Sequence, residues 1–154
     1  MAYPAGKSIT EDGVERVLTR EVFLHFLDLE VKRSRRYQNF FSVLVLKLDE
    51  LPEHDNGTGL QACCRRLARL LAEEVRDSDI LGALGEKKLA VILPYADLMA
   101  GGHTRSRFES SLQFYDFGRD GFRVVIEQVC FPRDGTDTSD LVRKVAGIET
   151  LHQI

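Results

Sequence analysis

Apolar residues recur at three- and four-residue steps near the start of the chain, from Val14 to Val31. This spacing predicts an amphipathic helix, and a break is expected near Thr19 because threonine there offers an N-cap. The apolar stripe of such a helix must pack on a sheet. The run from Phe40 to Leu48 is short, continuous and rich in aromatic and β-branched residues, which predicts a central strand covered on both faces.

The remaining apolar and polar runs predict alternating elements behind a breaker-rich loop at Glu50–Gly59. The expected segments are a helix from Leu60 to Val75, strands at Asp79–Leu84 and Lys88–Leu93, a helix from Ala96 towards Phe114, a turn at Tyr115–Gly121, a strand at Phe122–Phe131 and a helix from Thr138 to about Leu151. The order αβαββαβα contains βαββαβ, the ferredoxin-like arrangement. We therefore expect an α+β domain with a central, mainly antiparallel sheet flanked by helices that pack chiefly on one face.

Composition and charge limit the classes of function. The 154 residues are 44% hydrophobic, enough for one domain with its own core, and the net charge of -3 gives no overall basic field for nucleic acid or anionic lipid. There is no apolar run of membrane-spanning length and no signal peptide, so we expect a cytoplasmic protein. The three cysteines (Cys63, Cys64 and Cys130) are odd in number and lack metal-site spacing, which predicts reduced thiols and no metal centre. Residues 1–13 are expected to be a tail and residues 14–154 the domain.

The hairpin from Ala83 to Pro94 reads ALGEKKLAVILP, with Gly85 expected to supply positive backbone dihedrals to a tight turn. This hairpin resembles the signature of the GGDEF family, the diguanylate cyclases, in which most members read roughly RLGGDEFAVLLP. The segments Leu18–Tyr37, Phe41–Asp49 and Phe122–Asp140 also resemble family segments, in order and with nearly the expected spacing. The resemblance implies a single GGDEF domain of the palm type. The five signature positions are held by Gly85, Glu86, Lys87, Lys88 and Leu89.

The resemblance also implies that cyclase chemistry is absent. Family members hold Mg²⁺ with carboxylates at the end of the first strand and in the hairpin, and here those positions are Lys47, Lys87 and Lys88. A protonated lysine cannot coordinate Mg²⁺. Glu86 stands where a glycine normally lets the backbone approach the substrate phosphates. We expect no enzyme activity and no cofactor, and we interpret the three lysines as a solvated basic rim, with phosphate binding without turnover left open.

The substrate-binding loop also departs from the family. It is about three residues short, and the guanine-reading positions fall near Asp55, Asn56 and Gln61. The phosphate-contacting lysine of the final helix matches Gln153. The short loop and the missing lysine therefore also imply that cyclase activity is absent.

A second family pattern, RxxD, lies five residues before the signature and is matched by Arg76 and Asp79. In the family it marks an allosteric site for cyclic di-GMP, and a count from the hairpin places Arg107 where relatives supply a secondary arginine, with Arg105 as the alternative donor. An arginine fork and an aspartate suit a guanine or a phosphate. The structural alternative is that Arg76 complements a helix dipole and Asp79 caps the turn.

The sequence thus predicts a catalytically inactive GGDEF-like domain that binds cyclic di-GMP and reports it to an unidentified signalling protein. The alternative is a protein–protein interaction scaffold that binds no nucleotide. No nucleic-acid or membrane partner is expected, and a homodimer is left open.

Overall fold

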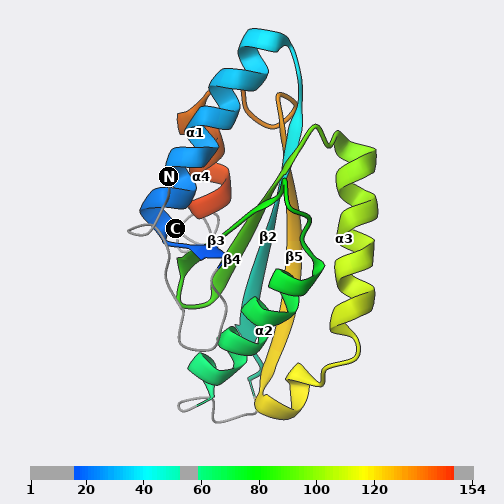
Figure 1. Ribbon diagram of the computed structural model, residues 1–154. Coiled ribbons are helices and arrows are strands. Elements are labelled where there is room, and N and C mark those ends of the chain that lie inside the picture. Colours follow the sequence, from blue (N-terminus) through cyan, green and yellow to red (C-terminus); the bar gives the residue numbers. More distant parts are fainter. Residues whose placement is uncertain (1–15, 53–58, 148–154) are drawn as a thin grey trace.

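In the part of the chain that the computed structural model describes, residues 16–52 and 59–147, helices cover a five-stranded sheet (Figure 1). The predicted order αβαββαβα is confirmed, with one short strand in front of it. The elements are β1 (Val17–Leu18), α1 (Arg20–Tyr37), β2 (Phe41–Glu50), α2 (Leu60–Glu74), β3 (Ile80–Gly85), β4 (Lys88–Pro94), α3 (Leu98–Leu112), the 3₁₀ helix η2 (Phe117–Asp120), β5 (Phe122–Phe131) and α4 (Thr138–Ala146).

The sheet has the order β1-β3-β4-β2-β5. The strand β1 pairs with β3 in parallel, and the other neighbours are antiparallel, as the sequence predicts. The central strand β2 pairs with β5 along its whole length, from Phe41 opposite Phe131 to Glu50 opposite Phe122. The two residues of β1 escape sequence analysis because the apolar repeat that begins at Val14 runs through them.

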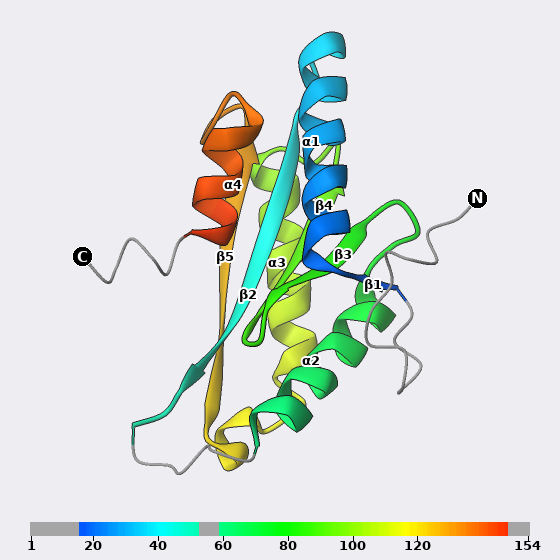
Figure 2. The same cartoon turned by 90° about the vertical axis from the view of Figure 1, so that its left-hand side faces the viewer.

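The helices cover both faces of the sheet, so the expectation that they pack chiefly on one face is wrong. Helices α1 and α4 lie on one face and α2 and α3 on the other (Figures 1 and 2). The reason lies in β2 and β4, whose consecutive apolar residues present buried side chains in both directions. On the α1/α4 side the helices contribute Phe23, Leu27, Val31, Leu141 and Val145, and on the α2/α3 side Leu67, Leu71, Phe108 and Leu112.

Helix α1 begins where the sequence predicts a break. The Thr19 hydroxyl accepts a hydrogen bond from the Val22 N–H, 3.4 Å away, and the helix ends at Gln38 with a left-handed φ of 57°. At the other end of the chain, α4 is described only as far as Ala146, so its predicted extension to Leu151 lies outside the described residues. None of the described helices is long and apolar enough to cross a membrane.

Cys63, Cys64 and Cys130 are free thiols. Cys63, on the buried face of α2, packs in the core, and this burial raises the pKa of its thiol to about 11. The thiolate is the reactive form, so Cys63 is a packing residue rather than a nucleophile.

The hairpin between β3 and β4 does not use its glycine as predicted. Among the described glycines, the one with a positive φ is Gly121, at 91°, and Gly85 is not in that conformation. A register shift between Ala83 and Gly85 adjusts the strands before the two-residue turn at Glu86 and Lys87. A Cβ atom added at Gly85 would meet nothing within 4 Å. Neither backbone angle nor space therefore requires glycine at this position.

Gly82, by contrast, is held by packing, and Gly82→Ala should destabilise the protein. Its added Cβ would lie 2.6 Å from Cδ1 of Phe23, a ring that is fully buried under α1. Overpacking of this kind lowers the free energy of unfolding by about 1–3 kcal/mol. Urea denaturation measures the change, and Gly85→Ala is the matched control, expected to leave stability equal or slightly higher. Equal losses in both variants would contradict the packing argument.

Candidate functional site

Lys47 on β2 and Lys88 on β4 lie directly opposite each other on neighbouring antiparallel strands. The Leu48 N–H donates to the Lys87 carbonyl at 2.8 Å, so residues 48 and 87 form a hydrogen-bonded pair. Lys47 and Lys88 are then a non-hydrogen-bonded pair, the arrangement in which opposing side chains lie closest. Lys47 is two residues from Val45, and Lys88 is two residues from Ala90, so both lysine side chains lie on the same face of the sheet as these residues. That is the face covered by α1 and α4. The two lysine side chains therefore leave neighbouring strands at adjacent positions, on the face that α1 and α4 cover.

The expectation of a solvated basic rim is wrong for these two lysines. Lys47 is 9% exposed and Lys88 5%, because the sheet at this point is still covered by helices. The Lys88 ammonium donates to the carbonyl of Ala146 at the end of α4, 3.4 Å away. Within residues 16–52 and 59–147, the Lys47 ammonium makes no hydrogen bond or ion pair. Only Lys87, with a side chain 42% exposed, fits the prediction.

Two carboxylates near the hairpin already have cationic partners. Glu50 lies 3.2 Å from the Lys87 ammonium, and Asp49 lies 3.6 Å from the Arg123 guanidinium. Mg²⁺ needs several oxygen ligands in near-octahedral geometry. In the described ranges no three His, Cys, Asp or Glu side chains are grouped so that they could hold a metal ion. The residues described here do not fit Mg²⁺. Asp55, Asn56 and Gln153 lie outside the described residues.

Arg76 and Asp79 form a closed turn between α2 and β3. The Asp79 carboxylate accepts a hydrogen bond from the Arg76 backbone N–H at 2.8 Å, and the Asp79 N–H donates to the Arg76 carbonyl at 3.0 Å. Asp79 therefore caps the turn, as the structural alternative predicts. Its second carboxylate oxygen and the exposed Arg76 guanidinium make no hydrogen bond or ion pair with other described residues.

The carbonyls at the end of α2 are satisfied by an arginine that sequence analysis does not identify. Arg16 donates to the carbonyls of Ala72, Val75 and Arg76, at 3.4, 3.3 and 2.6 Å. These carbonyls carry the negative end of the helix dipole, so Arg16 takes the role that the structural alternative gave to the Arg76 side chain. No local signal reveals this contact, because 56 to 60 residues separate the partners.

Arg107 reaches the same end of α2 from α3. Its Nε lies 3.5 Å from the Glu74 carboxylate, and its Nη2 donates to the Glu74 carbonyl at 3.3 Å. The Ser111 hydroxyl donates to the same carboxylate at 2.8 Å. The structure thus brings Arg107 close to the turn that holds Arg76, as a brace between two helices. Arg105, the alternative donor, forms an ion pair with Glu109 instead.

The two candidate regions lie at opposite ends of β3. The turn of Asp79 precedes Ile80, and the hairpin follows Gly85. Strands rise by about 3.3 Å per residue, which separates the two regions by roughly 17 Å. A ligand at one of them would leave the other free.

The sequence model described as "Diguanylate cyclase, GGDEF domain" matches residues 10–146. The chain is similar in fold to the GGDEF domain of DgcB from Caulobacter crescentus, solved in complex with c-di-GMP (TM-score 0.73, 13% identity, 99% of this chain and 90% of that one). It is also similar to the diguanylate cyclase SiaD from Pseudomonas aeruginosa, solved with its activator SiaC (0.72, 17%, 97% and 59%), and to a DGC protein from Thermotoga maritima (0.71, 15%, 87% and 96%). No curated protein matches. The family match spans most of the chain and agrees with the observed fold, and the chain therefore belongs to the GGDEF family.

Proposed function

We propose that this chain is a catalytically inactive GGDEF domain that binds cyclic di-GMP through Arg76, Asp79 and Arg107 and reports the nucleotide to a signalling protein. The observation that carries the proposal is the Arg76 guanidinium, which is exposed and uncommitted on a turn fixed by its neighbours.

The chemistry of the hairpin supports inactivity. Phosphoryl transfer of this type needs metal ions to neutralise the triphosphate and activate the attacking hydroxyl. The three lysines place positive charge where the metal would bind, and Asp49 and Glu50 are already neutralised by Arg123 and Lys87. Glu86 adds a carboxylate at the turn, where it repels phosphates.

The turn supports nucleotide binding. Arg76 can place two parallel N–H groups on a guanine edge or a phosphate, and the second Asp79 oxygen can accept hydrogen bonds from guanine nitrogens. Asp79 and Arg16 hold the turn before any ligand arrives, which lowers the ordering penalty on binding. The DgcB domain was solved with c-di-GMP, which supports the class of ligand. SiaD was solved with its activator SiaC, which supports a protein partner.

Calorimetric titration of the purified protein with cyclic di-GMP tests the proposal, and we expect saturable binding. Arg76→Ala should weaken binding by about 1.5–3 kcal/mol, the range for a lost charge-assisted hydrogen bond, and leave the melting temperature of the free protein unchanged. Asp79→Ala should weaken binding and also lower stability by about 1 kcal/mol, because it removes a cap. Lys87→Ala is the control and should bind like the wild type.

Two outcomes would contradict the proposal. If the wild type shows no binding at high micromolar nucleotide, the receptor function is wrong and the scaffold alternative replaces it. If binding survives Arg76→Ala but is lost in Lys87→Ala, the nucleotide occupies the hairpin region instead.

A further inference from the structure

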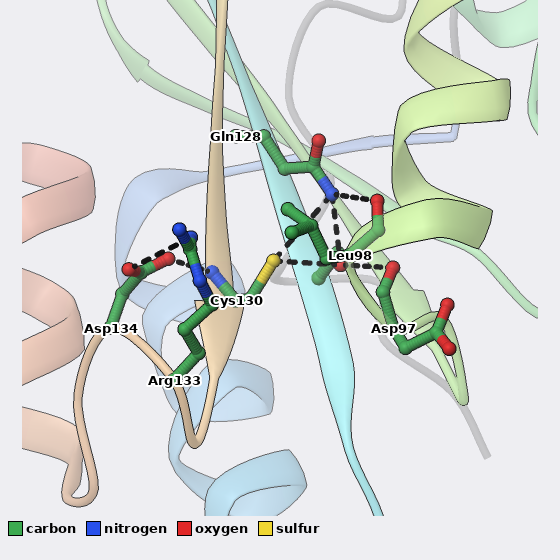
Figure 3. Close-up of polar contacts among 7 residues, drawn as sticks. Asp97, Leu98, Gln128, Cys130, Arg133 and Asp134 are labelled. Atoms are coloured by element: carbon green, nitrogen blue, oxygen red, sulfur yellow. Dashed lines mark hydrogen bonds and ion pairs between the residues drawn. The ribbon is translucent and has the colours of Figure 1, made fainter.

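Strand β5 forms one edge of the sheet, and two contacts establish which of its backbone groups point outward. At one end, the Leu51 N–H donates to the Gly121 carbonyl at 2.9 Å. In the continuous β2–β5 register, odd-numbered residues of β5 therefore direct their backbone N–H and C=O groups towards β2. At the other end, the Cys130 N–H points away from β2 and donates to the Asp134 carboxylate (Figure 3), and the Cys130 carbonyl accepts from the Asp134 N–H. Even-numbered residues of β5 therefore direct their N–H and C=O groups to the open edge.

Asp134 protects only one of these residues. Its carboxylate accepts from the Cys130 N–H at 2.7 Å, and its N–H donates to the Cys130 carbonyl at 2.8 Å, as a neighbouring strand would. The backbone groups of Val124, Ile126 and Gln128 form no hydrogen bond with any other described residue. A long edge strand with an unpaired row of donors and acceptors is a template for pairing with another strand.

Hollows flank this row along β5. One, of about 530 Å³, is lined by Phe122, Val124 and Ile126 together with the end of α3 and η2. The other, of about 540 Å³, is lined by residues 126–129 together with α3, α4 and the turn after β5. Ile126 lines both hollows, so they adjoin along the strand, and we refer to the two together as the groove.

The charges of the groove differ between its halves. The half at Val124 holds the two carboxylates of Glu109 and Asp116 beside the single cation of Arg123. The half at Gln128 holds Arg105, Arg133 and Lys144 beside Glu127 and Asp134. One half is therefore net acidic and the other net basic, an arrangement complementary to itself when two copies meet in opposite directions.

We propose that the edge of β5 binds the β5 edge of a second copy of this chain, in an antiparallel pair about a twofold axis at Ile126. This register sets Val124 of one copy opposite Gln128 of the other, and the outward backbone groups of both strands bond across the axis. It also sets the acidic half of each groove against the basic half of the other. A twofold interface must be self-complementary in this way.

Three side chains gain partners in this pair. Arg105 lies at the Gln128 half and Glu109 at the Val124 half, so the existing Arg105–Glu109 ion pair meets its counterpart across the axis. One carboxylate oxygen of Glu127 is buried and lacks a hydrogen-bond partner among the described residues. Glu127 stands opposite Val125 of the second copy, with Arg123 of that copy on the diagonal.

Sedimentation velocity of the full chain over a range of micromolar concentrations tests the proposal, and we expect a monomer–dimer equilibrium. Val124→Pro removes an outward N–H and leaves the β2–β5 ladder intact, because that N–H does not bond to β2. We expect this variant to stay folded by circular dichroism and to raise the dimer Kd by at least about tenfold, in the range of a lost central contact. Val124→Ala keeps the N–H and is expected to dimerise like the wild type.

The charged residues give a second test that does not depend on proline. Arg105→Glu and Glu109→Arg should each raise the dimer Kd, and the double exchange should restore it, because opposite charges meet again across the axis. A wild type that remains monomeric at every concentration would overturn the proposal. So would a dimer unaffected by Val124→Pro, and so would a double exchange no better than the single changes. If Val124→Pro fails to fold, the charge exchange alone decides.

Discussion

We expect the purified protein, incubated with GTP and either Mg²⁺ or Mn²⁺, to make no cyclic di-GMP above a buffer control. The expected loss is complete, because the metal supplies both charge neutralisation and nucleophile activation in this reaction. Lys47 and Lys88 are buried side by side at positions where the family resemblance places metal-binding carboxylates, and Lys87 is paired with Glu50. Chromatography with mass detection measures the product, and an active diguanylate cyclase is assayed in parallel. Robust product that depends on the protein would show that the lysines do not stand at the metal positions.

Restoring the carboxylates should not restore the activity. The variant combines Lys47→Asp, Glu86→Gly, Lys87→Asp and Lys88→Glu. It recreates the acidic residues but leaves unchanged the loop that the sequence predicts to be short, and positioning contributes as much to phosphoryl transfer as the metal does. It also removes the hydrogen bond from Lys88 to the Ala146 carbonyl. A strongly active variant would show that the guanine pocket is intact, contrary to the prediction from the loop.

The sequence predicts those parts of the fold that local patterns determine. The strand at Phe122–Phe131 is observed with the predicted bounds, and α2 ends one residue before the predicted helix. Thr19 caps α1 through a side chain three residues from its partner. Each of these features depends on alternation, helical periodicity or a contact within one turn, and such signals are present in a short window of sequence.

The features that the sequence does not predict depend on contacts between distant residues. Two helices on each face follow from the burial of both sides of β2 and β4, and that burial depends on the whole sheet. The prediction of a solvated rim is wrong for Lys47 and Lys88 for the same reason. Lysine is usually exposed, and only its neighbours in the fold bury it here. The sequence predicts a positive φ at Gly85, but a register shift in β3 makes this unnecessary.

The candidate site also has one part that the sequence predicts and another that only the fold shows. The turn of Arg76 and Asp79 is local, and its three-residue spacing already suggests a cap. The two arginines that fix the end of α2 come from far away, Arg16 from before β1 and Arg107 from α3. The sequence therefore indicates the turn and its chemistry, and only the fold shows what holds it in place.

Lys47→Met should raise the free energy of unfolding by about 1–3 kcal/mol, because replacing a buried charge with an apolar side chain of similar volume removes its desolvation penalty. It also removes the repulsion between like charges set directly opposite each other on neighbouring strands. Methionine is flexible enough to fill the space that the lysine stem leaves. Urea denaturation of the two proteins at neutral pH measures the change, and the slopes should agree because the fold is the same.

Lys88→Met is the matched variant, since it relieves the same repulsion from the other strand. Lys88 donates to the Ala146 carbonyl, so its replacement loses a hydrogen bond and leaves that carbonyl without its donor. The gain in stability should therefore be smaller than for Lys47→Met, or reversed in sign. If Lys47→Met instead lowers stability by as much as Lys88→Met does, the Lys47 ammonium has a partner in the folded protein, and the two lysines are equivalent members of a stabilising network.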